Sequence, residues 1–426
     1  MKLLILGGGG REHAIVWKLL QSSRATEIVC APGNAGICAE AEARVRCVPV
    51  DLNSLDDIVR VAIEEQPDLT VVGPEQPLTL GVVDEFERRG WRIFGPSKVA
   101  ARLESSKVFA KEFMQRHQIP TPKYAVCTSL QDVEDALPLF TAPIVVKADG
   151  LAAGKGVLIA ASREEAQQIS AEMLAGRTLA GAGSRLLLEE FVEGEELSLL
   201  CLSDGRQLAP LAAAQDYKRV GEGDTGANTG GMGAYSTDTL LEPEMREWVL
   251  AHIARPAIAG MAAEGAPFKG ILYCGLMLTA RGPLVLEFNA RFGDPETQPL
   301  LMRLHSDLLD ALEAVVDERI ESLALEWTPE VALGVVMASG GYPGSFESGQ
   351  PITGIEAAEA TGAKVFQAGT ALNNDNHSDS HIVTCGGRVL CVTALGADLE
   401  AAAAKAYSAV EKISFEHSYY RRDIGQ

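Results

Sequence analysis

The sequence lacks the residue patterns that identify several common classes of protein. Its eight cysteines include no CxxC pair and its seven histidines no HExxH array. This predicts reduced thiols rather than a disulfide framework, and it argues against a zinc site. No apolar run approaches the roughly 20 residues that span a bilayer, and the N-terminus "MKLLILGGGGREH" does not have the pattern of a secretory signal. We therefore expect a cytoplasmic protein without a membrane partner.

Positive charge is scarce as well. The chain has 37 Lys and Arg against 58 Asp and Glu, a formal net charge of −21. Because nucleic-acid binding needs a basic face, the composition argues against a nucleic-acid partner. A small anion can still bind, since exposed charges more than about 8–10 Å away are largely screened at physiological salt. An anionic ligand would need only a local cluster of cations and backbone amides.

The order of the apolar runs indicates several domains. In residues 1–100, strand-like runs ("KLLILG", "EIVCAPG", "LTVVGPE") alternate with helical patterns, which predicts a parallel sheet with its loops, "GPEQPLTLG" included, at one edge. Residues 121–187 contain strand-like runs and one helical pattern. The segment "GILYCGLMLTARGPLVLEFNARFGDPETQ" is typical of a hairpin, and a last unit follows residue 330. The expected fold class is thus multidomain, α/β and α+β.

Two glycine-rich loops resemble nucleotide-binding fingerprints but do not match them. "GGGGREH", residues 7–13, gives no G-x-G-x-x-G frame, although the amides of Gly9 and Gly10 beside Arg11 would suit an anion. "KADGLAAGKGV", residues 147–157, has glycines too closely spaced for a Walker loop, and Lys155 is followed by a glycine that cannot bind magnesium. A tight turn and a flexible surface loop are the respective alternatives.

The hairpin carries the strongest candidate metal site. In "VLEFNARFGDPETQ", Glu287 and Asn289 share one face of the expected strand, while Leu286 and Phe288 would pack on the other. A carboxylate and an amide oxygen suit magnesium, which takes its remaining ligands from water and phosphate. Arg291 and Asp294 follow at the same end of the strand. This density of polar groups after an apolar run is costly unless the groups are paired.

Two further segments carry candidate functional residues. "AAQDYKRVGEGDTGANTGGMGAYS", residues 213–236, has too many glycines for a helix or strand, and Asp216, Lys218 and Arg219 suggest a ligand-binding loop. "LLLEEFVEGEELSL", residues 186–199, joins carboxylates to an apolar pair, a combination that suits adenosine. A solvated acidic turn would have the same composition.

Taken together, these segments resemble the phosphoribosylamine–glycine ligase family of the ATP-grasp superfamily. The likeness runs nearly end to end, through "GGGREH", "APGNAG", "VVGPE", "KADGLAAGKGV", "EEFVEGEE", "QDYKR", "NTGGMGAYS", "EFNARFGDPETQ" and "GGYPG". The resemblance implies an N-terminal α/β domain (1–103), a central ATP-grasp domain (104–120 and 189–326), a mobile lid (121–188) and a C-terminal α+β domain (327–426).

The resemblance also implies roles for individual residues. In the ATP site, Lys107 and Lys147 would contact the phosphates, and the loop with Gly154, Lys155 and Gly156 would lie over the nucleotide. Glu189 and Val192 would contact the adenine, and Glu196 would contact the ribose. Glu287 and Asn289 would bind Mg²⁺ or Mn²⁺. The candidate catalytic residues are Arg291, which would hold the glycine carboxylate, and Asp216 and Asp294, which would shape the acceptor site. The substrate-binding residues would be Gly9, Gly10, Arg11, Lys218 and Arg219.

The activity implied is ATP-dependent joining of glycine to 5-phosphoribosylamine through glycyl phosphate. Another ATP-grasp ligase or carboxylase of purine synthesis, with a different acceptor, is the main alternative. A nicotinamide-dependent oxidoreductase is disfavoured by the missing G-x-G-x-x-G pattern, and a non-catalytic nucleotide sensor by the full set Lys147, Glu287 and Asn289. The sequence leaves the oligomeric state open, and a monomer agrees with it.

Overall fold

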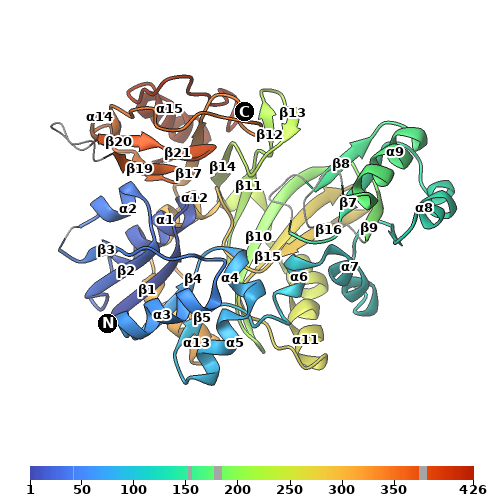
Figure 1. Ribbon diagram of the computed structural model, residues 1–426, viewed down its shortest axis with the longest axis horizontal. Coiled ribbons are helices and arrows are strands. Elements are labelled where there is room, and N and C mark those ends of the chain that lie inside the picture. Colours follow the sequence, from blue (N-terminus) through green and yellow to red (C-terminus); the bar gives the residue numbers. More distant parts are fainter. Residues whose placement is uncertain (42, 152–155, 177–184, 374–380) are drawn as a thin grey trace.

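The structure is a computed structural model that describes residues 1–41, 43–151, 156–176, 185–373 and 381–426. Its N-terminal part, blue in Figure 1, is a parallel sheet with strand order β3-β2-β1-β4-β5, as expected. Leu4 and Leu6 of the central strand pack on one face, and Leu3 and Ile5 on the other. The elements are β1 (Lys2–Gly7), α1 (Gly10–Leu19), β2 (Glu27–Pro32), α2 (Ala35–Ala39), β3 (Val45–Cys47), α3 (Leu55–Glu65), β4 (Leu69–Val72), α5 (Val82–Arg88) and β5 (Ile93–Phe94).

One loop predicted at the edge of this sheet is a helix instead. "GPEQPLTLG" forms α4 (Glu75–Leu80), with Pro74 at its N-cap and Pro77 in its first turn. Proline is tolerated there because the first N–H groups of a helix have no partner within the helix. Gly81, at φ 92°, ends the helix in the left-handed region. Helix α4 presents Glu75 at the edge where the other loops gather.

A long antiparallel sheet runs through the middle of the molecule, with strand order β16-β15-β10-β11-β14-β17-β21-β18. The predicted hairpin is confirmed as β15 paired with β16. The sheet continues into the C-terminal part of the chain, because β14 pairs with β17. Its strands are β10 (Glu195–Asp204), β11 (Leu208–Asp216), β14 (Gly233–Ser236), β15 (Lys269–Thr279), β16 (Gly282–Asn289), β17 (Val331–Ala338), β18 (Lys364–Gln367) and β21 (Arg388–Gly396).

Helices cover both parts of this sheet. Asp398 caps the last of them through the amide of Ala401 at 2.8 Å, as its position before an alanine-rich run predicts. The helices are α6 (Arg102–Ser105), α7 (Lys107–Arg116), α10 (Pro243–Val249), α11 (Arg255–Ala263), α12 (Thr297–Arg303), α13 (Leu308–Val316), α14 (Ile355–Glu359) and α15 (Leu399–Val410).

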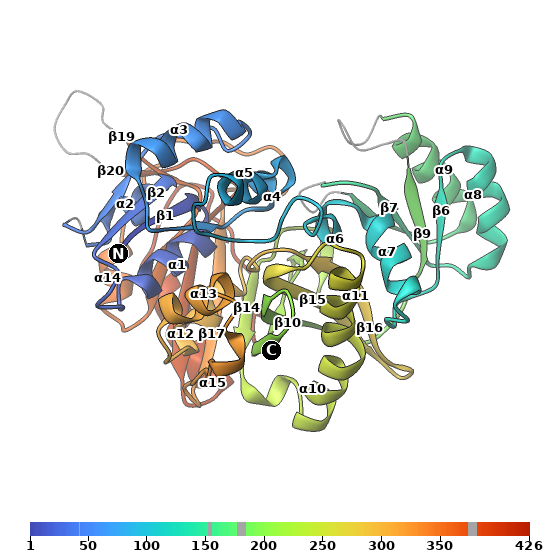
Figure 2. The same cartoon turned by 90° about the horizontal axis from the view of Figure 1, so that it is seen from below.

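A smaller antiparallel sheet, with order β6-β9-β7-β8, has a core of its own. Figure 2 shows it set apart from the N- and C-terminal parts, on the side of the central sheet that ends in β16. Two helices pack on it, of which the sequence indicated only the second. The elements are β6 (Tyr124–Cys127), α8 (Leu130–Ala136), β7 (Ile144–Ala148), β8 (Val157–Ala160), α9 (Arg163–Leu174) and β9 (Leu186–Glu190).

The glycine-rich segment 213–236 was wrongly predicted to contain no strand. It holds the end of β11, the hairpin β12 (Arg219–Gly221) with β13 (Thr225–Asn228), and β14. Gly223 and Gly231 lie in turns and have positive φ, as does Gly226 within β13. Order in this segment therefore comes from strand pairing as well as from turns.

The prediction that all thiols are reduced is also wrong. Cys38, in α2, and Cys47, in β3, form a disulfide with Cα atoms 5.7 Å apart. The chain turns back between α2 and β3 and brings together residues nine positions apart, a spacing outside the CxxC pattern. In the described ranges, every helix is too short or too polar to cross a membrane.

Candidate active site

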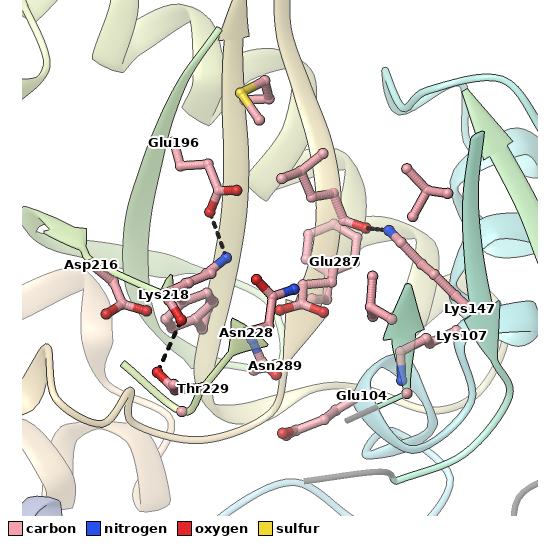
Figure 3. Close-up of a pocket in the computed structure, with 18 of the residues that line it drawn as sticks. Glu104, Lys107, Lys147, Glu196, Asp216, Lys218, Asn228, Thr229, Glu287 and Asn289 are labelled. Atoms are coloured by element: carbon pink, nitrogen blue, oxygen red, sulfur yellow. Dashed lines mark hydrogen bonds and ion pairs between the residues drawn. The ribbon is translucent and has the colours of Figure 1, made fainter. Parts of the chain in front are cut away.

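A cleft of about 1130 Å³ lies where the N-terminal part, the small sheet and the long sheet meet. Residues from all three line it, together with the C-terminal Arg388. Figure 3 shows its two sides: Lys107 and Lys147 on one, and Glu196, Asp216 and Lys218 on the other, with Glu287 and Asn289 between them. The structure thus brings together candidate residues from Arg11 to Asp294, about 280 positions apart in the sequence.

The two lysines expected at phosphates come from the first turn of α7 and the end of β7. Lys107 donates to the carbonyl of Gly150 at 3.0 Å, and burial lowers its pKa. Lys147 donates to Glu189 at 2.8 Å and to the carbonyl of Leu286 at 3.3 Å. Asp149, just after β7, accepts hydrogen bonds from the hydroxyl of Ser106 and from the amide of Val108, and so links the end of β7 to the start of α7.

Glu287 and Asn289 both face the cleft, as the strand alternation predicts, whereas Phe288 is 1% exposed in the core. Leu286 was expected beside Phe288 but lines the cleft. The reason is a bulge, since Glu287 pairs with Gly275 while Val285 pairs with Leu276. The bulge brings the carbonyl of Leu286 to Lys147 without turning Glu287 away.

The charge around Glu287 suits a divalent cation that arrives with phosphates. Burial opposes the carboxylate, but Lys218, Lys147 and Lys107 lower the pKa of Glu287 below its usual value. No other described residue forms a hydrogen bond with it, so its oxygens are available to a metal. Among the described residues, no cluster of three or more His, Cys, Asp or Glu could hold a metal alone. An ion here would need water or phosphate oxygens, as magnesium does.

The opposite side of the cleft carries an ion pair between two predicted contacts. Lys218 binds Glu196 at 2.7 Å. Burial alone would lower the pKa of Lys218, but Glu196 and nearby acids raise it well above its usual value. Asp216 lies nearby, and burial, with the negative charge of Glu296, raises its pKa well above the usual range. Its Oδ1 has no hydrogen-bond partner among the described residues.

Arg291 lies in a buried group of charges where the N-terminal part meets the long sheet. Its guanidinium binds Glu104 at 3.0 Å and Glu75 at 3.5 Å, and Glu75 lies 3.5 Å from Arg11. Burial opposes the charge, but Glu104 and Glu75 raise the pKa of Arg291. The guanidinium is therefore held as a cation that could bind a small carboxylate.

The N-terminal glycines surround a buried carboxylate. The amide of Gly9 donates to Glu12 at 2.6 Å, and a Cβ on Gly73 would collide with the Cγ of Glu12 at 2.6 Å. Arg11 binds the same carboxylate at 2.8 Å and the carbonyl of Phe292 at 3.1 Å. A Cβ on Gly10 would meet Gln298 at 2.6 Å. The glycine run thus makes room for protein side chains, and Arg11 extends from it into the cleft.

Asp294 is held by the C-terminal part of the chain. Arg388 donates to its backbone carbonyl at 2.7 Å and to its Oδ2 at 3.2 Å, and also binds the carbonyl of Gly230. Burial opposes the charge of Asp294, but Arg388 and Arg11 lower its pKa. Arg388 therefore ties Asp294 to the turn that follows β13.

The remaining candidates lie as follows. Val192, Gly156 and Glu189 line the cleft, and Glu189 is 1% exposed. Arg219 lines its outer part and donates to the carbonyl of Gly226 at 2.8 Å. Gly154 and Lys155 lie outside the described residues.

Several residues of the cleft were missed from the sequence. Glu75 ends the motif "VVGPE" but was not singled out as a site residue, Glu104 follows no recognisable motif, and Arg388 is about 90 positions from the nearest candidate. Tyr273 and Glu296 share a hydrogen bond of 2.6 Å. In the sequence, Tyr273 has the pattern of an ordinary strand residue and Glu296 that of a turn residue, so neither was identified as a site residue. For Lys111 a signal was available, because it follows Lys107 by one helical turn.

Comparison with known proteins accounts for nearly the whole chain. The phosphoribosylglycinamide synthetase N domain matches residues 1–104, its ATP-grasp (A) domain 105–297 and its C domain 332–426. The chain belongs to the phosphoribosylglycinamide synthetase family. This confirms the family and the ATP-grasp fold that the motifs predicted.

Relatives of the phosphoribosylglycinamide synthetase family resemble this chain over its full length. A phosphoribosylamine–glycine ligase of Xanthomonas axonopodis pv. citri is 49% identical over 426 residues, which cover 100% of this chain and 97% of that protein. The crystal structure of phosphoribosylamine–glycine ligase from Thermotoga maritima has a TM-score of 0.85, 34% identity and full coverage of both chains. The biotin carboxylase domain of Hydrogenobacter thermophilus 2-oxoglutarate carboxylase shares the fold. Its TM-score is 0.72 at 16% identity, and the match covers 98% of this chain and 91% of that one.

Proposed function

We propose that this protein is an ATP-dependent ligase that joins glycine to 5-phosphoribosylamine. The products are glycinamide ribonucleotide, ADP and phosphate, as in de novo purine synthesis. Membership of the phosphoribosylglycinamide synthetase family supports the activity. The observation that carries it is the convergence of Lys107, Lys147, Glu287 and Asn289 on one cleft between two antiparallel sheets.

ATP would lie between the small sheet and the long sheet. Lys107 and Lys147 would neutralise phosphate oxygens, with the loop of Gly154, Lys155 and Gly156 covering them. Adenine would meet the chain at Glu189 and Val192. Glu196 would bind the ribose hydroxyls, a role for which its carboxylate would have to share Lys218 or exchange it.

Glu287 and Asn289 would hold Mg²⁺ or Mn²⁺. Their oxygens are hard ligands, and the Glu287 carboxylate is already ionised by the surrounding lysines. A divalent cation bound there would neutralise charge on the triphosphate. The lysines contribute the same neutralisation from the other side of the cleft.

The acceptor side would hold glycine and the sugar phosphate. Arg291 would bind the glycine carboxylate, because its guanidinium is fixed by Glu104 and faces the cleft. Gly9, Gly10 and Arg11 would receive the sugar phosphate. Asp216, Asp294, Lys218 and Arg219 would shape the space between the two.

In the proposed reaction the glycine carboxylate attacks the γ-phosphoryl group of ATP, and ADP leaves. The amine of phosphoribosylamine then attacks the carbonyl of glycyl phosphate, phosphate leaves, and the amine loses a proton as the amide forms. The protein acts mainly by positioning and charge neutralisation. Water must be excluded, because an acyl phosphate hydrolyses readily.

The division into domains at residues 103, 120, 188 and 326, with 121–188 as a lid, is part of this proposal. So are the cytoplasmic location and the monomeric state.

A phosphate-release assay tests the proposal. ATP and Mg²⁺ are supplied with glycine and freshly made phosphoribosylamine, singly and together. We expect release only with both substrates. Release with bicarbonate in place of glycine would indicate a carboxylase, and release with a different amine would indicate another acceptor.

A further inference from the structure

Lys111 is a buried cation in the wall of the proposed ATP site. It extends from α7, one turn after Lys107, and its side chain is 2% exposed. Its Nζ lies 2.9 Å from Glu189 Oε2 and 2.6 Å from the hydroxyl of Thr121. A third, longer bond of 3.4 Å reaches the carbonyl of Val285. The ammonium group thus has two hydrogen-bond acceptors, Thr121 and Val285, and one ionic partner, Glu189.

The partner of Lys111 also binds Lys147. Glu189 is 1% exposed and places one carboxylate oxygen on each lysine, with Lys147 at 2.8 Å from Oε1. Two cations therefore share one anion. Burial lowers the pKa of Lys111 to about 8, so the group is still largely protonated at pH 7. The buried cluster of Lys111, Glu189 and Lys147 has a net charge of about +1.

The sharing has a consequence for Lys147. A carboxylate with one cation partner directs both oxygens at that partner, whereas a carboxylate with two divides its charge between them. With Lys111 present, Lys147 keeps protons free for another acceptor. One of them already points at the carbonyl of Leu286, beside Glu287. Without Lys111, the cluster would be neutral and Lys147 would be drawn toward Glu189.

We propose that Lys111 is a positioning residue that shares Glu189 with Lys147 and so keeps Lys147 available to the triphosphate. The inference rests on the proposed function, because it takes the ligand of Lys147 to be ATP. Lys111 itself need not touch the nucleotide. Its contribution is the second positive charge that offsets Glu189 and the bonds that hold this carboxylate in place.

The geometry also explains why a cation serves better here than an apolar side chain. Lys111 connects α7 to β9 through Glu189 and to β16 through Val285. Thr121 bonds the same carbonyl of Val285 at 2.7 Å. The lysine therefore joins both sheets, and an apolar replacement would leave Glu189 with one partner.

The test compares Lys111→Met, Lys111→Arg, Glu189→Gln and the double variant Lys111→Met/Glu189→Gln. Exposed Lys412→Met is the matched control. Affinity for a non-hydrolysable ATP analogue with Mg²⁺ is measured by calorimetry at pH 7, and KM for ATP and for glycine from phosphate release. Binding of the analogue does not depend on the ligation reaction. Failure of the inference would therefore show in analogue affinity, whereas failure of the proposed function would show in phosphate release.

For Lys111→Met we expect analogue affinity to fall and KM for ATP to rise by about tenfold, the effect of one lost charge near a polyanion. KM for glycine should stay within about twofold. Lys111→Arg should keep most of the affinity, because it keeps the charge. The double variant should recover affinity relative to Lys111→Met, since removing the Glu189 charge restores the net +1.

A purely structural role for Lys111 predicts the opposite pattern. The double variant would then be no better than Lys111→Met, and KM for both substrates would change together. Either result would overturn the inference, as would unchanged ATP affinity in Lys111→Met. If Lys111→Met does not fold, the effect of the Lys111 charge on analogue affinity can be measured by comparing the double variant with Glu189→Gln. These two variants differ only at Lys111, and we expect the double variant to bind the analogue more weakly. Equal binding in that pair would also refute it.

Discussion

Replacing Glu287 with Gln removes a charge from the cleft while keeping the shape of the side chain. The carboxylate has no hydrogen bond to another described residue, and the lysines around it retain other partners, Glu196 for Lys218 and Glu189 for Lys147. We therefore expect the fold to survive, with a melting temperature within about 3 °C of the wild type.

The effect on turnover should be much larger. Coordination of a metal beside a phosphoryl group contributes several kcal/mol to transition-state stabilisation. A loss of about 4 kcal/mol corresponds to a fall of about a thousandfold in rate. Asn289 would remain, but a neutral pair of amides binds a divalent cation poorly. Half-maximal activity should accordingly need at least about tenfold more Mg²⁺.

Phosphate release with both substrates, measured across a Mg²⁺ titration, checks this expectation. Exposed Glu411→Gln, at the C-cap of the distant helix α15, is the control and should behave as the wild type. If Glu287→Gln kept activity within about threefold of the wild type at limiting Mg²⁺, the metal would not be bound by this carboxylate. A loss of activity together with a large loss of stability would instead place Glu287 among structural residues.

Three further perturbations test other parts of the structure. Arg388→Met should raise KM for phosphoribosylamine by about 10- to 100-fold, because Asp294 loses charged hydrogen bonds; an unchanged KM in steady-state kinetics would argue against this. Burial opposes the Glu40 charge, but bonds to His13 and Lys364 lower the pKa of Glu40 from 4.5 to about 2. The contribution of ionised Glu40 to the free energy of unfolding is therefore present above pH 4.5 and is lost as pH falls toward 2. The difference in unfolding free energy between wild type and Glu40→Gln should shrink from pH 5 to pH 3, and a constant difference would contradict the assignment. Gly73→Ala should destabilise the protein by about 1–3 kcal/mol in denaturant titrations, since its Cβ would collide with Glu12; an equally stable variant would show that Glu12 can move aside.

Much of the fold could be predicted because its elements are locally periodic. The parallel sheet, the β15–β16 hairpin and the capped helix α15 all follow from apolar spacing and from turn or cap residues. Motif order then identified the family, since short segments in a fixed order are far more specific than any one of them. Glu287 and Asn289 facing one cleft follows from strand alternation alone.

The parts that were missed depend on contacts between distant segments. The Cys38–Cys47 disulfide needs a turn whose path the sequence does not state. Arg388 reaches Asp294 only because β21 and β17 extend the long sheet. Leu286 lines the cleft because of a bulge that an alternating pattern cannot reveal. Glu75 lay in a segment read as a loop, where two prolines obscured helix α4.

The long sheet has a mechanical consequence. Strand β14 joins β17 through consecutive main-chain pairs from Gly233↔Val335 to Ser236↔Ala332, so the central and C-terminal parts cannot rotate against each other without breaking a ladder. Among the residues that the structure describes, the small sheet has no such pairing to the long one. Any swing that seals the nucleotide from solvent should therefore fall to the small sheet, while Arg388 and Asp294 travel as parts of one stiff frame.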